Sequence, residues 1–393
     1  MATPFPFTSG QTLTAAQMNA VTTLPVSTKT ASYIAVVGDV GSRIVMNVAS
    51  ANTVTINNSI FAEGDTIFIA NKGAGVSTIT AGVGVTINTT GSLALAQHGG
   101  GTLVALSASV FTFFSGSAGV SYGVATGGSS SSITVGATNY TLLTFTSDSN
   151  LVVSTSGLFD VLLVGGGAGG GGSNGGGEAS GGGGAGAVVG LASTTTLYLA
   201  AGTVAIDVGA AGSGGTAGVR GSIGFESAIG SIMSAAGGGG GGANNSATSN
   251  FLGQPGASGG GNGSNTSTQV GGSVNELFGN AGGQGATTGP NGAGGGGGGY
   301  ASVGGNAVTN TGGAGGNGID ISPFITGATS NVAAGGGGGG VTAGAAGTGG
   351  VAGKTSGAGN SATTSGSGGG GTAGTSAAGG NGATGIVYVR FKV

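Results

Sequence analysis

The sequence predicts an all-β protein in two parts. An N-terminal β-sandwich or barrel-like module comes first, and a β framework with an inserted bundle of polyglycine-II helices follows, with almost no α-helix. Three observations carry this prediction. Short runs of β-branched and aromatic residues recur at intervals of about ten positions. Glycine is concentrated, since 82 of the 101 glycines follow residue 164, and only 4% of the residues are charged.

The first segment, residues 1–28, is too short to form a domain. It contains one brief helical signal, because Thr14 can cap a helix in which Gln17 occupies the third position. We therefore expect this segment to dock to another protein. Neither the basic region nor the apolar region of a signal peptide is visible in it.

Residues 29–117 predict the β module. Apolar and polar residues alternate cleanly in Thr53–Ile56 and in Val85–Ile87, so one face of these strands should be buried. The serine- and glycine-containing segment 118–138 predicts a flexible linker. Residues 139–393 form the glycine-rich part.

Strands are expected to begin and end this glycine-rich part, over about residues 139–235 and again over residues 385–393. The polyglycine blocks lie among them, at residues 165–187, 209–221 and 236–384.

The backbone N–H and C=O groups of the glycine blocks need hydrogen-bond partners. Disordered chains are usually charged and weakly hydrophobic, whereas this chain is 38% hydrophobic. A polyglycine-II helix repeats every three residues and has no internal hydrogen bonds, so every peptide group can bond to a neighbouring helix. An ordered bundle is the favoured interpretation, and a flexible glycine-rich stretch is the alternative.

The composition excludes several kinds of chemistry. With no Cys and a single His, His98, the chain offers neither thiol chemistry nor a two-histidine metal site. Seven basic residues and a net charge of −3 argue against nucleic-acid binding. No apolar run is long enough to span a bilayer.

Two segments resemble nucleotide-binding motifs, but each lacks an element that its motif requires. Val161–Gly170 lacks the helix that a dinucleotide motif needs, and Val351–Thr355 lacks the strand that precedes a P-loop. We expect no enzyme, no cofactor and no metal.

Large side chains are rare in the turns between glycine blocks, and aromatic residues are favoured at binding surfaces. The same side chains could instead cap the bundle or pack on the β framework. The candidate binding residues are Phe251, Leu252, Leu277, Phe278, Tyr300, Asp320 and Phe324.

Two long stretches resemble parts of tailed-bacteriophage fibres. Residues 31–116 resemble a β module common in tail fibres, through pieces such as Gly64–Asn71 and Val110–Phe114. Thr12–Asn19 looks like the start of many phage virion proteins. Residues 140–393 resemble the glycine-rich domain at the ends of tail fibres.

The pieces that carry this last resemblance include Phe159–Gly167, Ala235–Gly240 and Gly385–Arg390. The framework is also similar to the glycine-rich ectodomain of anaplastic-lymphoma-type receptor kinases, but the cysteines and the kinase domain of those receptors are missing here.

The resemblance implies a bacteriophage tail-fibre or receptor-binding protein, a homotrimer on the virion tail or an appendage, extracellular after lysis. Its N-terminus would contact other virion proteins. The seven candidate residues would contact a host cell-surface glycan or an outer-membrane protein, without membrane insertion.

Three alternatives stay open. The first is a head fibre or another decoration protein of the virion, and the second is a secreted bacterial glycine-rich surface or matrix protein. The third, a polysaccharide depolymerase, is disfavoured because the ten acidic residues are scattered.

Overall fold

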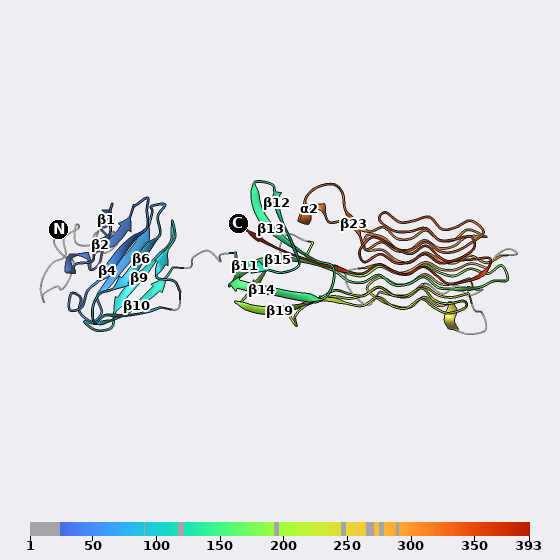
Figure 1. The fold of residues 1–393 in the computed structure, drawn as a ribbon, viewed down its shortest axis with the longest axis horizontal. Coiled ribbons are helices and arrows are strands. Elements are labelled where there is room, and N and C mark those ends of the chain that lie inside the picture. Colours follow the sequence, from blue (N-terminus) through green and yellow to red (C-terminus); the bar gives the residue numbers. More distant parts are fainter. Residues whose placement is uncertain are drawn as a thin grey trace, which may run out of the picture. The chain divides into compact units, whose positions relative to one another are not determined.

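The computed structural model describes residues 24–89, 91–116, 122–191, 196–244, 249–264, 271–274, 279–287 and 291–393. The chain divides into two compact units, Met1–Ser121 and Tyr122–Val393 (Figure 1). The all-β prediction is confirmed, since α2 (Ser322–Ile325) is the only α-helix among the described residues. The expected helical segment near Thr14 lies outside the described residues.

The first unit is a β-sandwich. Its six-stranded sheet has the order β1-β3-β5-β9-β10-β7, and its four-stranded sheet has the order β2-β4-β6-β8. From β1 to β6 the chain alternates between the two sheets, and the neighbouring strands are parallel, as in a solenoid. The strands are β1 (Val26–Lys29), β2 (Tyr33–Ile34), β3 (Arg43–Met46), β4 (Asn52–Ile56), β5 (Thr66–Asn71), β6 (Ser77–Ala81), β7 (Thr86–Thr89), β8 (Ala94–Leu95), β9 (Gly100–Ala105) and β10 (Val110–Ser115).

The core of this unit is formed by apolar residues at alternate positions of the strands, whose side chains point between the two sheets. Ile44 and Ile67 from one sheet and Val54 and Ile79 from the other are at most 2% exposed and belong to one hydrophobic cluster. A 3-10 turn, η1 (Val37–Asp39), connects β2 to β3.

The second unit begins with a framework of two sheets, ordered β11-β14-β19-β20-β21 and β12-β13-β25-β15-β17, with β18 also paired to β15. The C-terminal strand β25 lies between β13 and β15. The strands are β11 (Val124–Thr126), β12 (Ser129–Val135), β13 (Thr138–Phe145), β14 (Ser149–Thr155), β15 (Gly157–Val164), β17 (Val188–Val189), β18 (Thr196–Leu199), β19 (Gly202–Asp207), β20 (Ser227–Ile229), β21 (Met233–Ala235) and β25 (Ile386–Lys392).

The flexible linker predicted over residues 118–138 contains two strands in its described part, β11 and β12, so the prediction was wrong for those residues. Ser129–Val135 forms strand β12, whose whole length pairs with β13. Its serines are compatible with a strand because β12 is at the edge of the sheet and their side chains are exposed. The run of serines indicated a solvated surface, which an edge strand also provides.

Beyond the framework, the glycine blocks form a hydrogen-bonded lattice. The strand Ser180–Ala187 lies inside it, and its N–H groups donate to three different strands in a three-residue cycle. The donor–acceptor pairs are Gly181–Gly242 (2.8 Å), Gly184–Gly239 (2.8 Å) and Ala187–Ala236 (2.9 Å); Gly182–Gly295 (3.0 Å) and Ala185–Gly298 (3.0 Å); and Gly183–Gly369 (2.8 Å) and Gly186–Gly366 (2.9 Å).

The carbonyl groups of the same strand accept from three further strands, at residues 168–171, 258–261 and 336–339. One strand therefore bonds to six neighbours with a period of three residues, which is the polyglycine-II pattern. This finding supports the ordered bundle over a flexible stretch.

Close approach is what requires glycine in this lattice. Gly181, Gly182 and Gly183 do not have the positive φ that favours glycine. A Cβ atom added to any of the three would lie closer than 3.0 Å to a carbonyl oxygen of a neighbouring strand. Side chains larger than a hydrogen atom are therefore confined to positions that face gaps, turns or solvent.

Candidate functional site

The loops of the lattice gather at two ends, because the chain crosses it back and forth (Figure 1). We call the end that adjoins the β framework the near end and the opposite end the far end. The near end contains residues 227–235, 299–303 and 319–333. The far end contains residues 173–179, 244, 249–252, 308–311 and 374–376.

Phe251 and Leu252 lie at the far end. The 3-10 turn η2 (Ser249–Phe251), the yellow coil in Figure 1, carries the first of them. Its backbone is tied to the lattice, since Ala243 donates to the carbonyl of Asn250 (2.8 Å) and Gly263 donates to that of Phe251 (2.7 Å). The side chains of Phe251 and Leu252 are half-buried, so part of each can contact another molecule.

Buried polar side chains fix the far-end turn at residues 173–179. Asn244 is 1% exposed, and its Oδ1 accepts the N–H of Asn174 in β16 (Ser173–Asn174) at 2.7 Å. Ser264 is also 1% exposed and its Oγ accepts the N–H of Ala179 (3.1 Å). An amide or hydroxyl group here replaces the peptide partner that a strand loses where it turns. The two bonds therefore hold the turn at residues 173–179 in a defined conformation.

Tyr300 and Phe324 lie at the near end and pack inward. Phe324, on α2, is 5% exposed and belongs to a hydrophobic cluster with Ile321 and Val332 of the same loop and with Leu162 of β15. Tyr300 is half-buried against this cluster. For these two aromatic residues the contacts match the packing alternative.

Asp320 stabilises the near-end loop at residues 319–333 through hydrogen bonds. It lies in β22 (Ile319–Asp320), which pairs with β23 (Asn331–Val332). Its carboxylate accepts the N–H groups of Ser322 and Ser330, both at 2.9 Å, and the hydroxyl of Ser322 at 2.8 Å. The backbone bond from Ser322 is the largest of the effects that lower the pKa of Asp320.

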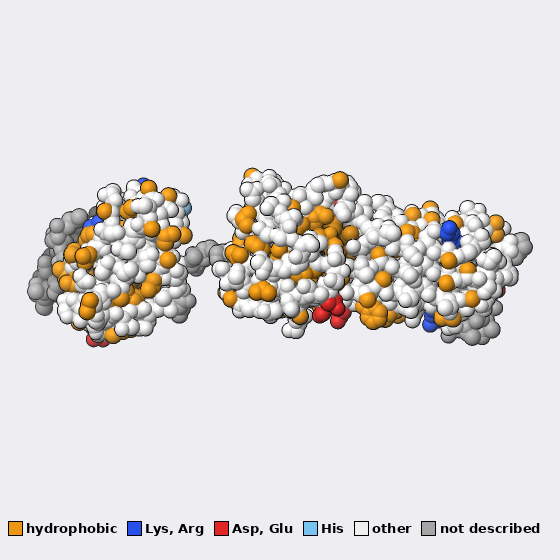
Figure 2. Space-filling model, viewed as in Figure 1, with side chains coloured by type: hydrophobic (Ala, Val, Ile, Leu, Met, Phe, Trp, Pro, Cys, Tyr) orange, Lys and Arg blue, Asp and Glu red, His pale blue; other side chains and the backbone are white. Residues whose placement is uncertain are grey.

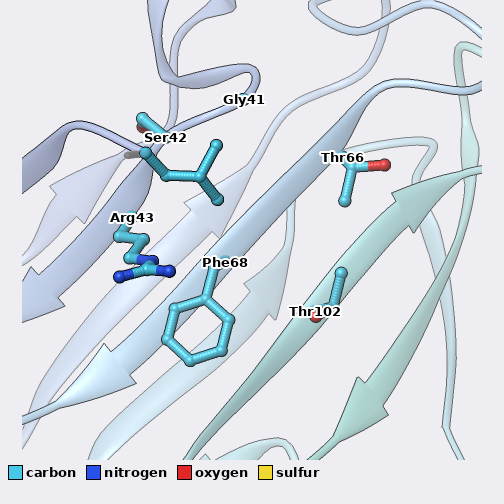
Figure 3. Close-up of a pocket in the computed structure, with 7 residues that line it drawn as sticks. Gly41, Ser42, Arg43, Thr66, Phe68 and Thr102 are labelled. Atoms are coloured by element: carbon cyan, nitrogen blue, oxygen red, sulfur yellow. The ribbon is translucent and has the colours of Figure 1, made fainter. Parts of the chain in front are cut away.

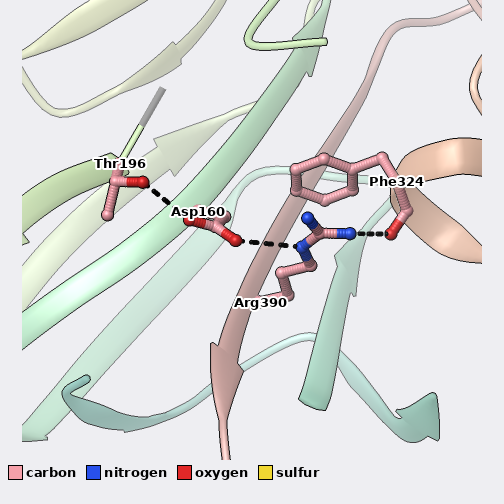
Figure 4. Close-up of polar contacts among 4 residues, drawn as sticks. All are labelled: Asp160, Thr196, Phe324 and Arg390. Atoms are coloured by element: carbon pink, nitrogen blue, oxygen red, sulfur yellow. Dashed lines mark hydrogen bonds and ion pairs between the residues drawn. The ribbon is translucent and has the colours of Figure 1, made fainter. Parts of the chain in front are cut away.

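A charged cluster joins this loop to the framework (Figure 4). Arg390 of β25 forms an ion pair with Asp160 of β15 (Nε–Oδ2, 3.1 Å) and donates to the carbonyl of Phe324 (2.5 Å). Its guanidinium carbon also lies 4.2 Å from the centre of the Phe324 ring and 4.7 Å from that of the Tyr140 ring. Thr196 donates to the second oxygen of Asp160 at 2.8 Å.

The sequence matches a family model described as a glycine-rich domain, over residues 143–392. The chain belongs to the glycine-rich domain family. No curated protein matches the sequence. The matched residues begin in β13 and end in β25, and these two strands pair, with Leu143 opposite Val389. The first and last strands of the glycine-rich domain thus close the framework on which the lattice is built.

Of the seven candidate residues, the structure separates two groups and leaves one pair undescribed. Phe251 and Leu252 lie at the far end of the glycine-rich domain, whereas Tyr300, Asp320 and Phe324 lie at the near end. Leu277 and Phe278 fall outside the described residues. The seven residues are therefore no single site.

The sequence analysis missed Arg390 and Asp160, the two charges of the near-end cluster. Each interrupts an otherwise apolar strand, β25 or β15, and is at most 15% exposed. In a chain with so few charges, a charged residue within an apolar strand indicates that a side chain of opposite charge lies next to it.

Figure 2 shows few charged side chains on the visible face of the lattice. Across the ranges that the structure describes, there is no group of three His, Cys, Asp or Glu residues that could hold a metal ion. The helices within those ranges include none that is long and apolar enough to cross a membrane.

Proposed function

We propose that this chain is a structural fibre protein of a bacteriophage virion that recognises the host surface. The far-end loops of the glycine-rich domain would contact the receptor. The docking segment expected at residues 1–28 ends in β1 of the sandwich (Val26–Lys29), so the part that precedes β1 would attach the protein to other virion proteins. The location would be the virion tail or an appendage, extracellular after lysis. The receptor would be a cell-surface glycan or an outer-membrane protein.

The observation that carries this proposal is the anchoring of two described far-end segments to the lattice. Asn244 and Ser264 hold the turn at residues 173–179, and backbone bonds from Ala243 and Gly263 hold η2. A loop that is ordered before binding loses less conformational entropy when it binds. Partly exposed Phe251 and Leu252 on such a loop are suited to contact.

Assembly as a homotrimer would strengthen weak contacts. Several copies held together engage a surface at high effective concentration, so that individually weak loops give firm attachment. Trimer formation remains part of the proposal and is measured by light scattering or analytical ultracentrifugation of the full chain.

An adsorption experiment tests receptor binding. Host cells are first incubated with the full chain, and the rate of phage adsorption is then measured. We expect inhibition by the parent chain and reduced inhibition by the double variant Phe251→Ala/Leu252→Ala. Phe225→Ala is the control, because Phe225 is 58% exposed on a lattice strand away from η2. Absence of inhibition by the parent chain would contradict the proposal.

Two other roles are separated by further measurements. A head fibre or other decoration protein would not inhibit adsorption, and gold labelling of the chain in electron micrographs of particles would locate it on the head. A secreted bacterial surface or matrix protein would be absent from purified particles. We propose no enzymatic activity, and release of sugars from host polysaccharide by the purified chain would contradict this.

A further inference from the structure

We propose that the first unit contains a second binding site, for an acidic saccharide, on the outer face of its six-stranded sheet. The site is a shallow cavity of about 380 Å³ (Figure 3). It is separate from the lattice loops and does not rest on their proposed function. Its lining residues are Leu24, Gly41, Ser42, Arg43, Thr66, Phe68 and Thr102.

Strand register brings the main groups of this site into one row. Arg43 of β3 is opposite Phe68 of β5, Phe68 is opposite Thr102 of β9, and Thr102 is opposite Phe114 of β10. Their neighbours along each strand, such as Ile44 and Ile67, point inward and are buried. The row therefore belongs to the outer face of the sheet.

The aromatic groups of the row are not needed for the core. The sandwich is filled by Phe111, Phe113 and Leu103, each at most 1% exposed. Phe68 is only half-buried, and Phe114 is 59% exposed. Large apolar side chains that stay exposed on one face are typical of a binding surface.

The polar groups of the cavity select the ligand. The Arg43 guanidinium carbon lies 6.0 Å from the centre of the Phe68 ring, and Figure 3 shows the two side chains beside each other. None of the residues that line the cavity is acidic, and the only ion pair within the described ranges is between Asp160 and Arg390. Arg43 is thus a cation without an acidic partner in that part of the chain.

These features together fit a uronic acid unit. The face of a sugar ring that carries C–H groups packs on an aromatic ring, while a guanidinium binds a carboxylate through two parallel hydrogen bonds. Thr102 adds a hydroxyl group beside Phe68. An apolar surface with a few polar groups that fix orientation is the usual composition of a small-ligand site.

Calorimetric titration of the full chain tests the site. The probe is tetragalacturonate, and its methyl ester is the matched ligand that keeps the rings but lacks the charge. We expect saturable binding of tetragalacturonate that weakens as salt is raised, because salt screens the ion pair. We expect affinity for the methyl ester to be lower by about ten-fold, since a charged hydrogen-bonded contact is lost.

Two variants test the residues. Arg43→Gln and Phe68→Leu should each lower affinity for tetragalacturonate by about ten-fold. Phe68→Leu removes the ring but keeps an apolar side chain at this half-buried position, so the sheet should still fold. Phe225→Ala, an exposed aromatic residue in the other unit, should leave the affinity unchanged.

Two results would overturn the proposal. The first is a lack of saturable binding by the parent chain; if the oligomeric state also changed in Phe68→Leu, this face would be a contact between copies. The second is equal affinity for the acid and its ester. The adsorption experiment is independent, so either proposal can fail alone.

Discussion

The substitution Gly183→Ala tests whether the lattice depends on backbone contact. Gly183 lies in the strand that bonds to six neighbours. A Cβ atom there would lie 2.7 Å from the carbonyl oxygen of Gly169 and closer still to that of Ala168. Since both oxygens belong to the adjacent strand, relief of this overlap requires that strand to move away.

The free-energy cost of this movement comes from the hydrogen bonds of the adjacent strand that it would break. The adjacent strand donates from Ala168 to Gly184 (3.0 Å) and from Gly171 to Gly181 (2.9 Å). Losing two such bonds costs about 1 kcal/mol each, and overpacking costs about 1–3 kcal/mol. We expect Gly183→Ala to lower the free energy of unfolding of the glycine-rich unit by about 3–5 kcal/mol.

Urea unfolding of the full chain, followed by tyrosine fluorescence, measures this change. Gly38→Ala is the control, because a Cβ atom at Gly38 would have nothing within 4 Å and its φ is not positive. That variant should stay within about 0.5 kcal/mol of the parent. If Gly183→Ala also stayed within about 1 kcal/mol, the neighbouring strands would have room for a methyl group and the reasoning would be refuted.

Three further predictions concern the charged groups. Arg390→Met should lower the free energy of unfolding by about 2–4 kcal/mol in urea, because Asp160 stays partly buried without its partner; Arg390→Lys should cost less. Bonds from Ser322 and Ser330 lower the pKa of Asp320, so its stabilising effect should be complete above about pH 4 and be lost as the pH falls through the lowered pKa. The protection factor of the Ser330 amide, the intrinsic exchange rate divided by the observed rate at the same pH, should then fall in acid, and Asp320→Asn should remove that fall. Burial raises the pKa of Glu178, so ionisation opposes folding above pH 4.5, and Glu178→Gln should raise the melting temperature at pH 7 but not at pH 4.

Composition and alternation predicted the kinds of structure well. The clean alternation in Thr53–Ile56 became β4, whose valine and isoleucine are buried. The block after residue 164 became a lattice, because glycine without charge leaves backbone hydrogen bonding as the main way to order the chain. The serines of β12 misled the prediction, since an edge strand and a linker both expose polar side chains.

The partners of each strand and loop were beyond sequence reasoning. Glycine segments are nearly identical, so nothing in Ser180–Ala187 says that it bonds to residues 236–242 rather than to another block. The end at which a loop emerges follows from that pairing. Phe251 at the far end and Phe324 at the near end therefore looked equivalent in sequence, although only Phe324 contacts Arg390.

The position of β25 has a consequence for how the glycine-rich unit is made. This strand lies between β13 and β15 and is synthesised after every glycine block. The strands β13 and β15 therefore leave the ribosome long before β25 is synthesised. Contacts between residues so far apart in the sequence also form slowly. We infer that the unit folds only after β25 has been translated. A chain truncated before β25 should therefore stay unfolded and be degraded by proteases.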